Sequence, residues 1–127
     1  MQKILSFIPQ HARLEDVLTD QNLARLGDAY ANFIYSIALS KKNNKPTGAK
    51  VSSNILAQAL KKAQLRGYLP KRMDRHELGD AAEALLAYAW AHAAITIEES
   101  VTTLLSMENP AQAFAKLLNQ AKGKLNL

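Results

Sequence analysis

The apolar residues of this chain recur at intervals of three and four, and almost never alternate with polar residues. Val and Ile are scattered at this spacing, while Ala, Leu, Lys and Gln dominate the middle and the end of the chain. Spacing of this kind favours amphipathic helices, and the four dominant residue types are good helix formers. The sequence therefore predicts an all-α fold without a β-sheet.

Six helices are expected from the apolar periodicity together with start and stop signals. They span approximately residues 11–18, 20–40, 52–65, 75–94, 97–107 and 110–121. Thr19 is expected to cap the second helix, and Gly67 with Pro70 to end the third. Three further starts carry a capping-box spacing or a cap followed by proline, namely Asp74 with Glu77, Thr96 with Glu99, and Asn109 with Pro110.

Composition limits what the chain can be. Its 127 residues, 48% of them hydrophobic, suit one compact domain covering residues 1–127. The absence of cysteine excludes disulfides and thiolate metal sites. No apolar run reaches the roughly 20 residues of a membrane span, so we expect no membrane association and a cytoplasmic location. The net charge of +5 suits an anionic partner such as RNA.

One acidic residue lies in the middle of a predicted helix, whereas acidic residues normally lie at helix starts. Asp28 directly follows Gly27 in the second helix, with Ala24 and Ala31 about one turn away on either side. Small residues around Asp28 permit another helix to approach it closely.

Asp80 and Glu83 are three residues apart, so both carboxylates project from one face of the fourth helix. Like charges at this spacing repel each other unless a cation lies between them, and Mg²⁺ or Mn²⁺ prefers oxygen ligands. If the second and fourth helices pack together at Gly27 and Gly79, Asp28 joins this pair. The sequence then predicts a three-carboxylate metal site able to support phosphodiester hydrolysis.

The same acids have an ordinary alternative explanation as surface charges. Asp28 lies three residues after Arg25 and can form an ion pair with it, and the other two carboxylates can pair with Arg75, His76 or a lysine. Spacing alone leaves both interpretations open.

The motifs around these carboxylates resemble those of the ribonuclease III family. Residues 26–29, LGDA, are similar to the family's signature helix, which supplies a metal-binding aspartate. Residues 79–87, GDAAEALLA, are similar to its later helix, whose D-x-x-E pattern supplies an aspartate and a glutamate to the same metals. Residues 51–69 resemble the intervening helix. The resemblance covers about residues 19–94 and implies a ribonuclease III-like endonuclease domain.

Two positions depart from the family pattern. Ala24 stands where the signature carries a further glutamate, and Gln21 replaces another acidic residue. The compact branch called mini-ribonuclease III, which lacks an attached double-stranded-RNA-binding domain, is more similar to this chain, because it too has a non-acidic residue there.

The resemblance implies a homodimeric endoribonuclease that hydrolyses phosphodiester bonds of double-stranded or structured RNA. Asp28, Asp80 and Glu83 are then the expected catalytic residues, holding one or two Mg²⁺ or Mn²⁺ ions. In the dimer, two signature helices face each other and bury apolar side chains. The large apolar residues available for this interface are Tyr30, Phe33, Ile34 and Trp90, each of which ordinary core packing also explains.

The RNA is expected to contact the chain through a basic loop. Residues 41–50, KKNNKPTGAK, carry four lysines beside Pro46 and Gly48, which end the second helix. The predicted RNA-binding residues are Lys41, Lys42, Lys45, Lys50 and Asn54. A solvated linker and a helix cap are the ordinary alternatives for the lysines and for the asparagine.

Two other classes of function remain open. The first is a catalytically weakened ribonuclease III relative that acts as an RNA-binding or assembly subunit. The absence of an acid at position 24 favours this class, unless Asp20 or an acidic residue of a partner subunit completes the site. A helical interaction protein without a role in RNA would carry Asp80 and Glu83 pointing into solvent.

Overall fold

The computed structural model describes residues 4–127, and in this range it contains six α-helices, one short 3₁₀ helix and no strand. The elements, in chain order, are α1 (Leu14–Leu18), α2 (Gln21–Asn43), α3 (Ser53–Lys62), η1 (Arg66–Tyr68), α4 (Arg75–Ala91), α5 (Ile97–Leu105) and α6 (Pro110–Leu125). The all-α prediction with six helices is confirmed. No helix in the described range is long and apolar enough to cross a membrane.

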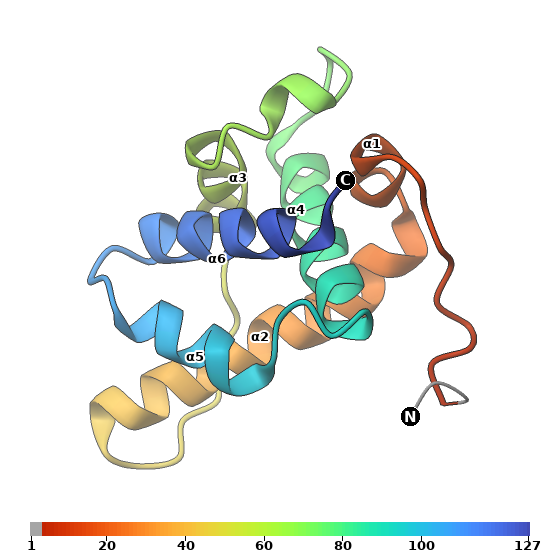
Figure 1. Ribbon diagram of the computed structural model, residues 1–127. Coiled ribbons are helices and arrows are strands. Elements are labelled where there is room, and N and C mark those ends of the chain that lie inside the picture. The colour runs from red at the N-terminus through yellow and green to blue at the C-terminus, as the bar shows by residue number, and fades with distance from the viewer. Residues whose placement is uncertain (1–3) are drawn as a thin grey trace.

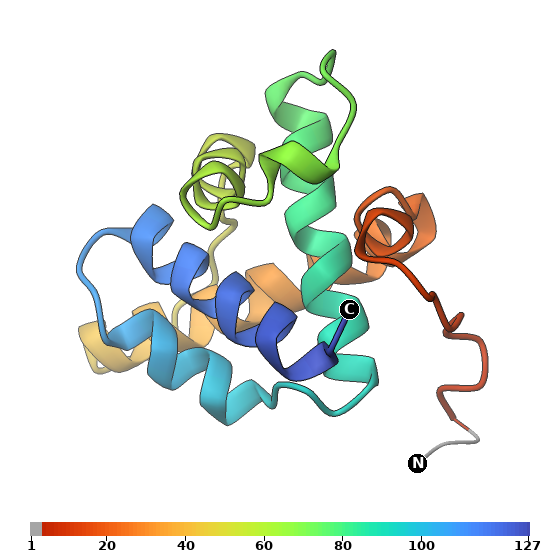
Figure 2. The same ribbon diagram turned by 45° about the horizontal axis from the view of Figure 1, so that its top comes forward.

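The helix α4 forms the centre of the fold. Eleven of its residues, all between Leu78 and Ala89, are buried, and most of them are Ala or Leu, so nearly every side of the helix is apolar. A helix of this kind has to be enclosed by others. Figures 1 and 2 show α4 surrounded by α1, α2, α3 and α6, which all contact it.

The helices α5 and α6 close the other side of the core against α2 and α3. Phe114 of α6 is fully buried, and its ring packs at 6.1 Å from that of Tyr35 on α2. The hydroxyl groups of Tyr30 on α2 and Ser100 on α5 share a buried hydrogen bond of 2.8 Å. Burial of both groups is tolerated because each satisfies the other.

Local capping signals predicted most helix starts correctly. The capping boxes of α4 and α5 and the Asn109–Pro110 start of α6 are all present. The cap predicted for α2 is wrong. Asp20 caps this helix by accepting from the N–H groups of Asn22 and Leu23, while the Thr19 hydroxyl donates to the carbonyl of Glu15.

The observed helix ends differ from the predicted ones more than the helix starts do. α2 continues to Asn43, and Asn44 then leaves the helix with a φ of 54°. α3 ends at Lys62, well before Gly67, because Gln64 adopts a φ of 63°. α1 is shorter than predicted, starting only at Leu14.

The four large apolar residues considered for an interface have different environments. Tyr30 and Ile34 are buried in the core, and Trp90 is half-buried with its ring 6.0 Å from that of Tyr30. Phe33 is different, since 53% of it is exposed on the outer side of α2. Core packing therefore accounts for Tyr30, Ile34 and much of Trp90, but not for Phe33.

Candidate functional site

The helices α2 and α4 cross in direct backbone contact at Gly27. A Cβ atom on this residue would overlap the main-chain carbonyl of Glu83, so no side chain fits between the helices. The contact places Asp28, the next residue of α2, beside Glu83. Gly79 does not share this contact as expected, because it faces the carbonyl of Ser53 at the start of α3.

The three predicted carboxylates line one surface depression of about 320 Å³. Asp28 is exposed at its α2 side, Asp80 is half-buried on α4, and Glu83 is only 7% exposed. The remaining lining residues are Gln21, Ala24 and Arg25. The structure thus brings Asp28 together with Asp80 and Glu83, which lie more than fifty residues further along the sequence.

Glu83 is strongly disfavoured as an anion. Burial, a hydrogen bond with the carboxyl group of Asp28, and the charges of Asp28 and Asp80 raise the pKa of Glu83 to about 8. Without a cation, Glu83 is therefore mostly protonated at neutral pH.

The pKa of Asp80 is also raised. Burial is the main cause, and the negative charges of Asp28, Asp74 and Glu77 act in the same direction, against the opposing effect of His76. Burial and repulsion by neighbouring carboxylates thus disfavour the charged forms of both Asp80 and Glu83.

Within residues 4–127, no ion pair joins any of the three carboxylates to an arginine or lysine. The alternative pairings with Arg25 and Arg75 are therefore not observed. The burial of Glu83 also argues against two carboxylates pointing into solvent.

The donor set suits a hard divalent cation, because it consists of carboxylate oxygens without a positive partner. As these side chains stand, no group of three or more His, Asp or Glu in the described part of the chain is arranged to hold a metal ion. Metal binding would thus require the carboxylates to turn toward a common point. Deprotonation of Glu83 would accompany this step.

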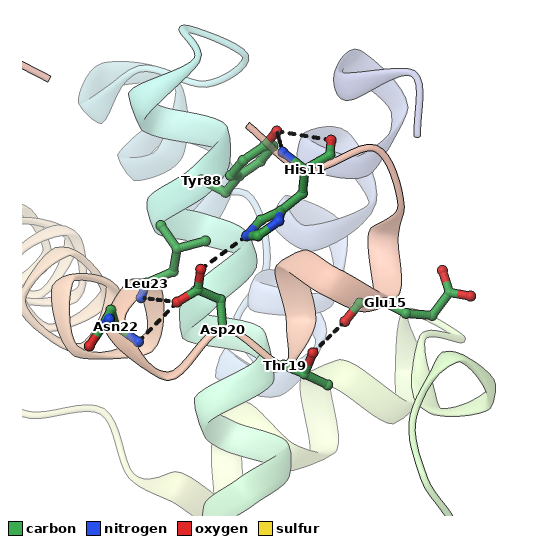
Figure 3. Close-up of polar contacts among 7 residues, drawn as sticks. All are labelled: His11, Glu15, Thr19, Asp20, Asn22, Leu23 and Tyr88. Carbon is green, nitrogen blue, oxygen red and sulfur yellow. Dashed lines mark hydrogen bonds and ion pairs between the residues drawn. The ribbon is translucent and has the colours of Figure 1, made fainter. Parts of the chain in front are cut away.

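Asp20 does not complete the carboxylate set. Its Oδ1 accepts from the first turn of α2, and its Oδ2 lies 3.0 Å from Nε2 of His11 (Figure 3). The hydroxyl of Tyr88 accepts from the backbone N–H of His11 and holds this segment against α4. Ala24 lines the depression, but its side chain is a methyl group and so provides no oxygen to it.

The four predicted RNA-binding lysines are all exposed, but they are not equally near the carboxylates. Lys41 and Lys42 belong to the last turn of α2 rather than to a loop, about 20 Å along the helix from Asp28. The following segment runs back along α2, and Lys50 lies next to Val51, whose N–H bonds to Asn32. Lys50 is therefore closest to the depression.

Asn54 is exposed in the first turn of α3. It does not cap this helix, because the Ser52 hydroxyl accepts from the N–H of Ile55 and so provides the cap.

A second basic segment lies closer to Asp80 and was missed in the sequence. Lys71, Arg72 and Arg75 are exposed immediately before or at the start of α4. The segment is shaped by Arg66, whose guanidinium donates to the carbonyls of Leu69, Pro70 and Lys71. The dense basic run PKRMDRH of residues 70–76 was the signal that could have revealed it.

Asn32 was also missed. Its side chain contacts both Asp28 and the segment that follows α2. Nothing in the sequence distinguishes it from other polar residues on a helix surface.

Comparison with protein families gives one finding. The family described as Ribonuclease III matches residues 21–127, which include the helices α2 to α6 and all three carboxylates of the depression. No match was found among curated proteins.

Proposed function

The chain belongs to the ribonuclease III family, and from this premise we propose that it is a metal-dependent endoribonuclease acting on double-stranded or structured RNA. The single observation that carries the proposal is the α2–α4 crossing at Gly27, which sets Asp28 beside Asp80 and Glu83 in one depression. The roles proposed for these residues agree with the motifs that surround them.

Asp28, Asp80 and Glu83 are proposed to hold Mg²⁺ or Mn²⁺. The bound ion would supply the positive charge that activates water and neutralises the phosphodiester. Glu83 would lose its proton on binding the cation, and it would hold the ion from the most buried side of the depression. Asp28 and Asp80, being more accessible, face the side from which RNA approaches.

The RNA backbone is proposed to lie across exposed basic residues on both sides of the depression. Lys71, Arg72 and Arg75 would contact phosphates beside α4, and Lys50 would do so beside α2. Lys41, Lys42, Lys45 and Asn54 lie farther out or on α3 and would extend the contact. Such contacts depend on charge rather than base sequence.

Two copies of the chain are proposed to associate through α2. Phe33 is 53% exposed, and Leu26, Ala29 and Ile37 share its side of the helix at spacings of three and four residues. An apolar stripe of this kind on a helix surface suits a partner of the same shape. Because Asp28 belongs to the same helix, a dimer of this form would bring two depressions into one assembly.

A catalytically weakened relative that binds RNA or serves as an assembly subunit is the second candidate. The observation in its favour is Ala24, which leaves the depression with three carboxylates. This alternative and the nuclease share the basic surface, so they differ in cleavage and not in binding.

The test incubates the purified protein with double-stranded RNA and Mg²⁺ or Mn²⁺, beside the double variant Asp80→Asn and Glu83→Gln. Glu98→Gln serves as a matched control, since Glu98 is an exposed acid in the first turn of α5. We expect metal-dependent cleavage by the wild type and the control, and none by the double variant. RNA binding without cleavage by the wild type would favour the second candidate. If the wild type neither binds nor cleaves RNA, both candidate functions are refuted.

A further inference from the structure

Asn32 connects Asp28 to the segment that follows α2. Its Nδ2 donates to Oδ1 of Asp28 over 3.3 Å, and its Oδ1 accepts from the backbone N–H of Val51 over 2.9 Å. The two ends of one amide therefore bind a carboxylate of the depression on one side and a main-chain group on the other.

The orientation of this amide is determined by Val51. An N–H donor needs the oxygen of the amide and not its nitrogen, so the NH₂ group is left facing Asp28. Val51 itself is anchored, because its side chain is buried and the next residue, Ser52, caps α3. The donor that Asn32 offers to Asp28 is thus held by a part of the fold outside α2.

Asp28 needs such a restraint more than the other carboxylates do. Glu83 is enclosed by the core and Asp80 is half-buried, whereas Asp28 is exposed and has no ion-pair partner within residues 4–127. An exposed aspartate has more rotamers open to it than a buried carboxylate, and ordering each such ligand costs a metal site conformational entropy.

We propose that Asn32 is a positioning residue, which holds the carboxylate of Asp28 toward the depression so that one of its oxygens is ready for a divalent cation. The role rests on the proposed metal-dependent function and concerns the affinity of the site for the cation. Groups that orient metal ligands in this way typically change metal affinity about 10- to 100-fold when they are removed.

The test compares Asn32→Ala with Ser36→Ala as the matched control. Ser36 lies one turn further along α2, and its hydroxyl bonds to the same segment through the N–H and carbonyl of Ala49. The control therefore loosens the segment without touching Asp28. Mn²⁺ binding to each metal-free protein is measured by titration calorimetry, and the Mg²⁺ concentration for half-maximal RNA cleavage is measured in parallel.

We expect Asn32→Ala to weaken Mn²⁺ binding about tenfold and to raise the Mg²⁺ requirement, with binding by Ser36→Ala unchanged. Thermal unfolding of all three proteins verifies that each is folded. Equal Mn²⁺ affinity in wild type and Asn32→Ala would overturn the role of Asn32 alone, and an equal loss in both variants would assign it to the segment instead. Failure of the wild type to bind Mn²⁺ would overturn the proposed metal site, and the role of Asn32 with it.

Discussion

The backbone of Gly27 lies directly against the main-chain carbonyl of Glu83. This contact determines how closely α2 approaches α4 and therefore how near Asp28 lies to the two carboxylates of α4. The arrangement of the depression thus depends on a position that has no side chain at all.

Replacing Gly27 by alanine is expected to destabilise the protein strongly. The new methyl group meets backbone atoms that cannot move aside without separating two helices, so we expect a loss of about 3 kcal/mol or more in the free energy of unfolding, measured by urea denaturation. Gly123→Ala is the control, because nothing lies near this exposed helical position. There alanine should stabilise by about 0.5–1 kcal/mol, and an equal effect at both sites would contradict the tight crossing.

Glu83→Gln is expected to stabilise the metal-free protein at alkaline pH. Folding raises the pKa of Glu83 from its ordinary value of 4.5 to about 8, so the folded protein loses stability as the pH rises from the lower value through the upper one. Glutamine removes this loss. In EDTA, the gain in Tm over wild type should therefore be larger at pH 9 than at pH 5, whereas Glu98→Gln should show no such trend. A gain independent of pH would argue against a protonated Glu83.

Phe33→Glu is expected to convert a dimer into a monomer. The charge would lie in the middle of the exposed apolar stripe of α2, and its burial without a partner is costly. Sedimentation equilibrium should give a dimer dissociation constant roughly tenfold higher or more. Met107→Glu places the same charge on an exposed apolar residue beyond α5 and should leave association unchanged. Wild-type protein that sediments as a monomer would contradict the proposed interface.

A double variant that replaces Arg72 and Arg75 by alanine is expected to bind double-stranded RNA more weakly than a double variant that replaces Lys41 and Lys42 by alanine. The two arginines lie near Asp80, and the two lysines lie at the far end of α2. Loss of two phosphate contacts should reduce the slope of log K against log salt concentration by about 2. Fluorescence anisotropy over a range of salt concentrations measures this slope, and a larger effect of the lysine pair would move the RNA path to the end of α2.

The sequence predicted the helices well where short-range signals decide the outcome. Both capping boxes and the proline start are contacts within four residues of one another, so they form largely independently of the rest of the fold. The cap of α2 was misplaced by one residue because Thr19 and Asp20 are both good caps, and the pairing of Asp20 with His11 comes from a contact nine residues away.

The candidate site was predictable in its residues but not in its environment. The carboxylates Asp28, Asp80 and Glu83 stood out by their small neighbours and by their motifs. That Glu83 is enclosed while Asp28 is exposed depends on how α2 and α4 cross, which is a three-dimensional property. The link through Asn32 to Val51 likewise joins residues nineteen positions apart.

The segment after α2 runs beside this helix and bonds to it at regular intervals, with two residues of the segment for every four residues of the helix. Asn32, Ser36 and Ser40 bond to Val51, Ala49 and Thr47, so four residues of helix correspond to two residues of extended chain. Four helical residues rise about 6 Å and two extended residues about 6.6 Å, and the two repeats stay in step over this distance. An inserted residue between Thr47 and Val51 would break this register, so the segment tolerates exchanges of side chains far better than any change in its length.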